Sequence, residues 1–230
     1  MLYWRIFLLF ILIFLSSFCS AQNNDFAKLR KEMVEKQIKA RGIKNRRILK
    51  VMEKVERHKF LPPFLQRFAY EDRPLPIGHG QTISQPYIVA LMTELLCPKP
   101  TDKILEIGTG SGYQAAILAE LVDKVYTIEI IPELAKSAEK RLKILGYKNV
   151  FVRCGDGYFG WPEAAPFDGI IVTCSPEKIP QPLIEQLKEG GRMVIPVGEG
   201  WSQKLLVLHK KKGKIIKQYI TDVLFVPMKH

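Results

Sequence analysis

Three alternate glycines, Gly108, Gly110 and Gly112, form the stretch of this sequence best suited to chemistry. The apolar run at residues 104–107 predicts a strand before them, and residues 114–121 predict a helix after them. A glycine-rich turn between a strand and a helix lets the backbone approach a ligand closely, and the free N–H groups at the helix start point toward it. The stretch therefore predicts a ligand site, with a simple tight turn as the alternative.

Two acidic residues near this turn narrow the class of ligand. Glu106 lies two positions before the first glycine, and Glu129 ends the next apolar run at residues 125–128. A carboxylate at the tip of a neighbouring parallel strand can accept both hydroxyls of a ribose. The glycine spacing departs from the dinucleotide fingerprint, because Tyr113 stands where a third glycine of G-x-G-x-x-G would fall. The pattern therefore favours a nucleoside ligand other than a nicotinamide dinucleotide.

A second stretch with chemical potential lies upstream. Residues 70–81 are rich in Pro and Gly and predict irregular structure, whereas residues 87–96 predict an apolar helix. Ser84 stands where a helix N-cap is expected, and a purely structural cap is one interpretation of it. Alternatively, the hydroxyls of Thr82 and Ser84, beside free N–H groups at a helix start, form an anion site suited to a carboxylate.

The remaining elements must position these residues, and they alternate as a doubly wound α/β sheet does. The expected helices are 25–40, 45–55, 87–96, 114–121, 132–145 and 182–187, the last ending at Gly190-Gly191. The expected strands are 104–107, 125–128, 150–153, 168–173, 192–197, 204–209 and 215–226. We expect a mostly parallel seven-stranded sheet, an antiparallel C-terminal hairpin and an N-terminal helical cap. Ligands in such sheets bind outside the carboxyl ends of the strands, where Glu106, Glu129 and Asp156 fall.

Length and charge limit the possible partners. The chain has 230 residues, enough for one α/β domain with a short extension, and a formal net charge of +12. The positive charge is concentrated at residues 28–59 and 210–217. Such basic segments can bind nucleic acid, an acidic polypeptide or a membrane surface, or they can simply form solvent-exposed faces without a partner. No basic run is interleaved with aromatic residues as single-strand binding requires, so no specific nucleic acid is expected.

Residues 1–21 are expected to lie outside the fold. Arg5 precedes an apolar run at 6–15, and the small residues at 19–21 suit a cleavage site, which predicts a secretory signal peptide. Alternatively, the basic residues at 28–36 would keep the chain that follows residue 21 in the cytoplasm, and residues 1–21 would then be a membrane anchor. Both interpretations stay open.

The cysteines and histidines indicate no metal site. Cys97, Cys154 and Cys174 show neither disulfide nor zinc spacing, and Cys174 is interpreted as a structural thiol. The histidines at 58, 79, 209 and 230 show no catalytic-triad or metal-ligand spacing, and His79 is interpreted as loop filling.

Several stretches together resemble a known family, the bacterial-type protein-L-isoaspartate O-methyltransferases, which are class I S-adenosylmethionine-dependent methyltransferases. They are residues 70–96, 106–119, 155–157, 165–173 and 225–228. The glycine turn is shared with all class I methyltransferases, whereas the motif at residues 76–86 is nearly specific to this family. The resemblance runs from about residue 28 to the end. It implies a Rossmann-like methyltransferase domain at 22–230, with a helical cap and substrate loop at 22–100 and a cofactor-binding sheet at 101–230.

The resemblance also implies roles for individual residues. S-Adenosylmethionine would be the methyl donor, without a metal. Its methionine part would be held by Glu106 and the turn of Gly108, Thr109, Gly110 and Gly112; Glu129 would hold the ribose and Asp156 the adenine amino group. Asp156 is alternatively a turn residue between two glycines. The substrate loop would comprise Ile77, Gly78, His79, Gly80 and Gln81, and Ser84, helped by Thr82, would orient the substrate.

The implied substrate is an isoaspartyl residue in a damaged protein or peptide. Its α-carboxylate would take the methyl group, and the methyl ester would return to aspartate through a succinimide. A carboxylate is already ionised near neutral pH, so no general base is needed and catalysis rests on proximity and alignment. The alternatives are a class I methyltransferase acting on RNA or a small molecule, and a non-catalytic nucleotide-binding or membrane-anchored interaction module. We expect a monomer. Cofactor supply favours a cytoplasmic or cytoplasm-facing domain, with export as the alternative.

Overall fold

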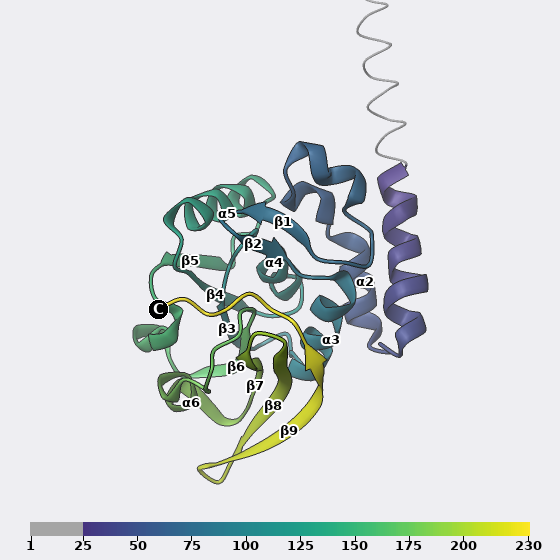
Figure 1. Ribbon diagram of the computed structural model, residues 1–230. Coiled ribbons are helices and arrows are strands. Elements are labelled where there is room, and N and C mark those ends of the chain that lie inside the picture. Colours follow the sequence, from purple (N-terminus) through teal and green to yellow (C-terminus); the bar gives the residue numbers. More distant parts are fainter. Residues whose placement is uncertain (1–24) are drawn as a thin grey trace, which may run out of the picture.

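The computed structural model describes residues 25–230, and these form a seven-stranded sheet with helices on both faces (Figure 1). The strand order is β5-β4-β3-β6-β7-β8-β9. The strands are β3 (Lys103–Ile107), β4 (Lys124–Glu129), β5 (Val150–Cys154), β6 (Phe167–Val172), β7 (Leu187–Glu199), β8 (Ser202–Lys211) and β9 (Lys214–Val223). The first five pair in parallel and the last two antiparallel, so the predicted fold class is confirmed.

Helices cover the sheet on both sides, which explains why its strands are almost continuously apolar. The helices are α2 (Arg46–Lys54), α3 (Pro86–Leu96), α4 (Tyr113–Ala119), α5 (Pro132–Ile144) and α6 (Gln181–Gln186). Successive residues of β6 point to opposite faces, as in any strand. Ile171 packs in the larger core with α3 and α4, whereas Ile170 and Val172 pack in a second core with α6.

The N-terminal cap is a continuous helical segment at residues 25–41, close to the predicted helix at 25–40. Its middle turn, Met33–Ile38, is a π-helix, and Gly42 ends the segment in a left-handed conformation with φ of 96°. The next helix, α2, starts where the Asn45 side chain accepts hydrogen bonds from the backbone N–H groups of Arg47 and Ile48. Such side-chain caps satisfy donors that a helix start otherwise leaves unpaired.

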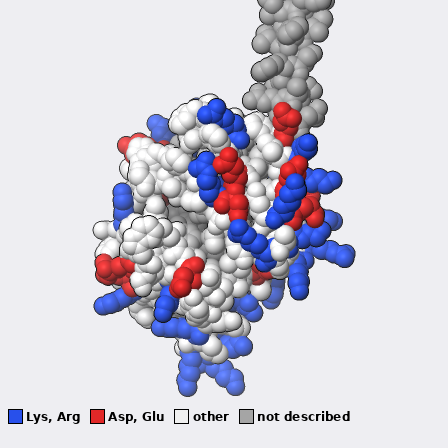
Figure 2. All heavy atoms as spheres, turned by 45° about the vertical axis from the view of Figure 1, so that its right-hand side comes forward, with Lys and Arg blue, Asp and Glu red and all other residues white. Residues whose placement is uncertain are grey.

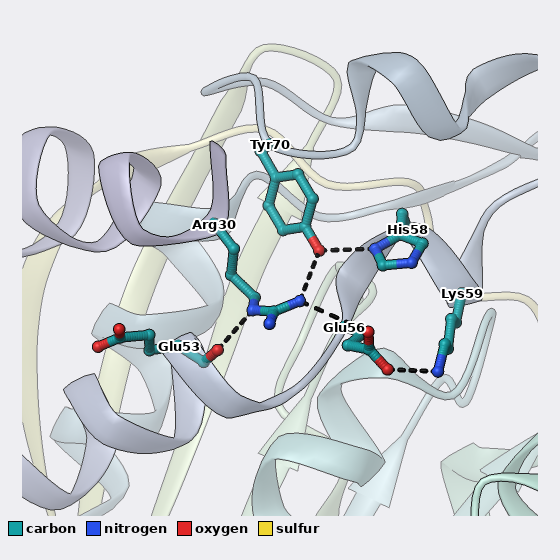
Figure 3. A network of polar contacts seen from close by, with 6 residues as sticks. All are labelled: Arg30, Glu53, Glu56, His58, Lys59 and Tyr70. Carbon is teal, nitrogen blue, oxygen red and sulfur yellow. Dashed lines mark hydrogen bonds and ion pairs between the residues drawn. The ribbon is translucent and has the colours of Figure 1, made fainter. Parts of the chain in front are cut away.

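A polar network fastens this cap to the domain (Figure 3). The Tyr70 hydroxyl contacts His58 Nδ1 at 2.7 Å and accepts a 3.3 Å hydrogen bond from Arg30. Arg30 also lies 3.8 Å from Glu56, which pairs with Lys59. Burial lowers the pKa of His58 to about 4, so the imidazole is neutral at neutral pH and bonds the hydroxyl without a buried charge.

The segment before α3 differs from its prediction. The sequence predicts irregular structure at residues 70–81, but they contain part of a small antiparallel hairpin of β1 (Leu75–Gly78) and β2 (Gln81–Ile83). His79 and Gly80 form its turn, with φ of 54° and 70°. Two consecutive left-handed residues match the twist of a tight hairpin, so the Pro and Gly content marks a turn rather than an unstructured loop.

The predicted N-cap of α3 is also wrong. Gln85 is the N-cap residue, and its side chain makes no capping hydrogen bond. Pro86 occupies the first helical position, where its missing N–H costs nothing. The N-cap therefore lies one residue after Ser84, and the helix begins one residue before its predicted range of 87–96. Ser84 therefore precedes the helix, and its hydroxyl is not used as a cap.

The C-terminal strands lie where the sequence predicts them, but their ends differ from the predicted ones by up to five residues. The sequence predicts that Gly190 and Gly191 end a helix, but α6 ends at Gln186 and both glycines lie within β7. The pairing of β6 with β7 shifts register between Phe167 and Gly169, and the extra length of β7 is taken up there. The turn at Lys212 and Gly213 joins β8 and β9 as expected.

Basic side chains gather around the N-terminal helix and at the tip formed by β8 and β9 (Figure 2). Around the helix they alternate with acidic side chains, and Lys36–Glu32 and Lys39–Glu35 form ion pairs of 2.9 Å one turn apart. The predicted signal peptide or anchor at 1–21 lies outside the described residues. Within residues 25–230, no helix is long and apolar enough to cross a membrane.

Candidate active site

A hollow opens at the carboxyl ends of β3, β4 and β6, where parallel-sheet topology places ligand sites. Its lining includes the glycine turn, the segment 81–84 as one wall and residues 226–229 as a C-terminal wall. The predicted site residues that line it are Gln81, Thr82, Ser84, Glu106, Gly108, Thr109, Gly110 and Glu129. Those that do not line it are Ile77, Gly78, His79, Gly80, Gly112 and Asp156. The structure thus brings together residues separated by almost fifty positions in the chain.

The glycine turn requires a left-handed backbone at all three glycines, with φ of 97° at Gly108, 52° at Gly110 and 85° at Gly112. At Gly108 there is also no room for a side chain, because a Cβ would lie 2.5 Å from Thr173 Oγ1. That hydroxyl donates hydrogen bonds to the carbonyls of Gly108 (2.7 Å) and Ile107 (3.0 Å). Thr173 therefore fixes the course of the turn from the neighbouring strand end.

Glu129 ties the turn to the end of β4. Its carboxylate accepts a 2.8 Å hydrogen bond from the Gly110 N–H through Oε2, and one of 3.0 Å from the Ile131 N–H through Oε1. A carboxylate oxygen has two lone pairs, so each oxygen can accept one further donor. A pair of adjacent hydroxyls, as on a ribose, fits these remaining positions.

Glu106 is fully buried, and neither of its carboxylate oxygens has a hydrogen-bond partner among the described residues. Burial raises its pKa to about 8; the nearby Thr127 hydroxyl, which bonds Thr109 instead, opposes the shift and the Glu129 charge adds to it. A buried carboxylate without a partner is costly, and it is stabilised by a cationic or N–H-donating ligand. The ammonium-bearing methionine part of S-adenosylmethionine supplies such a donor, so these residues fit that cofactor.

This buried acid predicts how stability and cofactor binding depend on pH. Because the folded-state pKa of Glu106 is raised above its unfolded value, the folded state holds the proton more tightly, and the stability contributed by the protonated acid is lost as pH rises from about 4.5 to 8. We expect the thermal midpoint of the cofactor-free protein to fall over this range, and Glu106→Gln to flatten the profile.

Calorimetric titration at pH 7 in buffers of different ionisation enthalpy should also detect a proton released as cofactor binds. Equal pH profiles for both proteins would contradict the assignment.

The two hydroxyl residues of the substrate segment face the hollow. Ser84 is half-buried and Thr82 is exposed. Neither hydroxyl forms a hydrogen bond with any other described residue, so both are open to a ligand. The first turn of α3 follows directly, and Val89 of that turn also lines the hollow. Two hydroxyls without a protein partner suit an anionic group such as a carboxylate.

Asp156 and Cys174 differ in how well they fit their predictions. Asp156 Oδ1 accepts a 2.8 Å hydrogen bond from the Tyr158 N–H at the start of the short helix Gly157–Phe159, which matches the alternative of a turn residue. Its neighbour Gly157 lines the hollow, so Asp156 lies at the margin of the site.

Cys174 lines the hollow, and burial raises its pKa to about 12, which keeps the thiol protonated and unsuited to nucleophilic attack.

The C-terminal segment is the part of the site for which the sequence suggests no role. Residues 226–229 line the hollow, although they lie more than a hundred positions from the glycine turn. The Ser175 N–H donates to the Val226 carbonyl and the Met228 N–H donates to the Ser175 carbonyl, both at 2.8 Å. The motif at residues 225–228 marks this segment in the sequence, but only the fold shows that the segment lies at the hollow.

Comparison with known proteins agrees with this geometry. The profile of the family described as protein-L-isoaspartate(D-aspartate) O-methyltransferase (PCMT) matches residues 28–230. The chain belongs to the PCMT family. A protein-L-isoaspartate O-methyltransferase of Gloeobacter violaceus is 57% identical over 197 residues, covering 85% of this chain and 96% of that relative. One from Nitrosococcus oceani is 58% identical over 185 residues, covering 80% of this chain and 84% of that relative.

Solved structures of PCMT proteins share the fold. A structure described as protein-L-isoaspartate O-methyltransferase has a TM-score of 0.80 and 30% identity, covering 87% of this chain and 66% of that protein. A PCMT structure from Plasmodium falciparum, in complex with S-adenosyl-L-homocysteine, has a TM-score of 0.76 and 29% identity, covering 87% of this chain and 98% of that protein.

Proposed function

We propose that this PCMT-family protein is a repair methyltransferase that moves a methyl group from S-adenosylmethionine to the α-carboxylate of L-isoaspartyl residues in damaged proteins and peptides. The products are the isoaspartyl methyl ester and S-adenosylhomocysteine, and the ester returns to aspartate through a succinimide. One observation carries the proposal: within residues 25–230, a buried carboxylate without a partner, a ribose-type carboxylate and two unbonded hydroxyls line the same hollow. The first two suit the cofactor and the last two suit an anionic substrate.

Each group has a proposed role. Glu106 and the turn at 108–112 hold the methionine part of the cofactor, Glu129 holds the ribose, and Asp156 borders the adenine. Bound there, S-adenosylmethionine supplies an electrophilic methyl group. Ser84, helped by Thr82 and the Gln81 backbone, orients the substrate carboxylate. This carboxylate is ionised near neutral pH, so the protein's contribution is alignment rather than proton transfer.

The segment 77–81 is proposed to admit the substrate backbone. Its hairpin turn at His79 and Gly80 is exposed and lies beside the hollow wall formed by Gln81 and Thr82. An isoaspartyl residue adds a backbone kink to the polypeptide, and an open edge next to the carboxylate site accommodates it. His79 serves the turn by adopting φ of 54°, and we assign it no chemical role.

A pair of peptides tests the reaction directly. The protein is incubated with methyl-labelled S-adenosylmethionine and peptides that differ only in isoaspartate against aspartate. We expect base-labile label on the isoaspartyl peptide alone. Bound cofactor with neither peptide labelled would contradict the proposal and favour a class I methyltransferase acting on RNA or a small molecule.

We also propose that the domain works as a monomer on the cytoplasmic side of the membrane, with residues 1–21 as its point of membrane attachment. The cofactor is made in the cytosol, and basic residues follow the apolar run directly, which favours retention on that side. Expressed in bacteria with residues 1–21 intact, the domain should survive protease added to spheroplasts. Its digestion there would indicate export instead.

A further inference from the structure

The charges around the hollow pose a problem for an anionic substrate. Glu129 lines it, and Glu106 adds a second carboxylate when it releases its proton on cofactor binding. The proposed substrate brings a further carboxylate. Among the lining residues in the described part of the chain, Lys229 is the one cationic side chain. Like charges oppose entry and an opposite charge favours it, so the position of Lys229 bears on how substrate is captured.

The segment that carries Lys229 has a defined position. In Figure 1 it runs as the yellow trace from the end of β9 across the centre of the molecule. The buried side chain of Gln203 accepts a 2.6 Å hydrogen bond from the Phe225 N–H and donates one of 3.0 Å to the Phe225 carbonyl. Met228 is bonded to Ser175 as described above, so Lys229 follows directly on a residue fixed at the hollow's edge.

The Lys229 ammonium is available to a ligand. The side chain is exposed, and it forms neither an ion pair nor a hydrogen bond with any residue between 25 and 230. Some basic residues of the N-terminal helix differ in this respect, because acidic neighbours one turn away pair with them. A lysine that lines a hollow and keeps its ammonium free of these described residues is suited to an anion that arrives from outside.

We propose that Lys229 is a substrate-binding residue that draws the isoaspartyl α-carboxylate into the hollow, where Ser84 then orients it. This inference rests on the proposed function. Because Lys229 is exposed and its charge is screened by solvent, it acts on capture of the substrate more than on the methyl-transfer step. It concerns substrate capture and assigns Lys229 no contact with the cofactor.

The test compares Lys229→Gln with Lys229→Arg and with Lys178→Gln, an exposed lysine that does not line the hollow. For Lys229→Gln we expect the KM for an isoaspartyl peptide to rise about fivefold with kcat changed less than about twofold, the scale of one partly screened charge pair. The peptide's Kd for the full-length protein loaded with S-adenosylhomocysteine should rise equally. Lys229→Arg and Lys178→Gln should resemble the parent, because both leave a cation at the hollow.

Salt gives an independent readout. The parent's KM should increase between about 0.05 and 0.5 M salt, and that of Lys229→Gln should change less, because screening acts on the charge that the variant lacks. An unchanged KM and salt response in Lys229→Gln would overturn the inference, as would a loss of cofactor affinity equal to the loss of peptide affinity. Failure of the proposed function itself is distinct, because the parent would then methylate no isoaspartyl peptide at all.

Discussion

Gly108→Ala is expected to reduce the affinity for S-adenosylmethionine by at least about 100-fold, or by about 2.7 kcal/mol. Two costs add at this position. A φ of 97° is strained for any residue with a side chain, and the new Cβ would meet Thr173 Oγ1 at 2.5 Å. Thr173 cannot move away freely, because its hydroxyl bonds the carbonyls of Ile107 and Gly108. The turn must therefore shift, and its backbone N–H groups with it.

Gly146→Ala is the matched control. Gly146 also has a left-handed backbone, with φ of 86°, but a Cβ added there would meet no described atom within 4 Å, and the residue is exposed beyond the end of α5. Both variants should lose stability through backbone strain, on the order of 1–2 kcal/mol. Only Gly108→Ala should lose cofactor binding, measured by calorimetry at a temperature where both proteins are folded. Equal cofactor affinity in the two variants would show that cofactor binding does not depend on the backbone conformation of the turn at Gly108.

The features that the sequence predicts well are those encoded by neighbouring residues. The alternate glycines, the apolar run before them and the acid at the end of β4 are all local signals, and the structure places Gly108 and Glu129 together as expected. The helix at 132–144 is also recognisable from Pro132 at its start and Gly146 at its end. Local signals of this kind depend on backbone preferences that the chain carries before it folds.

The features that escape prediction depend on partners distant in the chain. The sequence identifies Glu106 as acidic, but its lack of a partner among residues 25–230 follows from the packing of several strands around it. The hairpin at 75–83 has strands of four and three residues, too short to show a period-two pattern. The C-terminal wall arises from bonds between Ser175 and residues about fifty positions later. The tertiary fold decides each of these, and local sequence does not.

Ser84→Ala is expected to lower kcat/KM for an isoaspartyl peptide by about 10- to 100-fold while changing cofactor affinity less than about twofold. The range corresponds to one hydrogen bond to a charged group. The structure separates the two effects, because Ser84 forms no cap on α3 and its hydroxyl bonds no other described residue, so its removal leaves the fold intact. Steady-state methylation kinetics and cofactor calorimetry on the same preparation measure both quantities.

Thr82→Ala and Ser202→Ala complete this comparison. Thr82 lines the same wall but is more exposed, so a smaller loss of activity is expected; Ser202, at the start of β8, does not line the hollow, and its replacement should have no effect. If Ser84→Ala instead lost cofactor affinity and activity together, the serine would serve the shape of the cofactor site. A selective loss of turnover would locate the substrate carboxylate at Ser84 and separate this role from the cofactor contacts of Glu129.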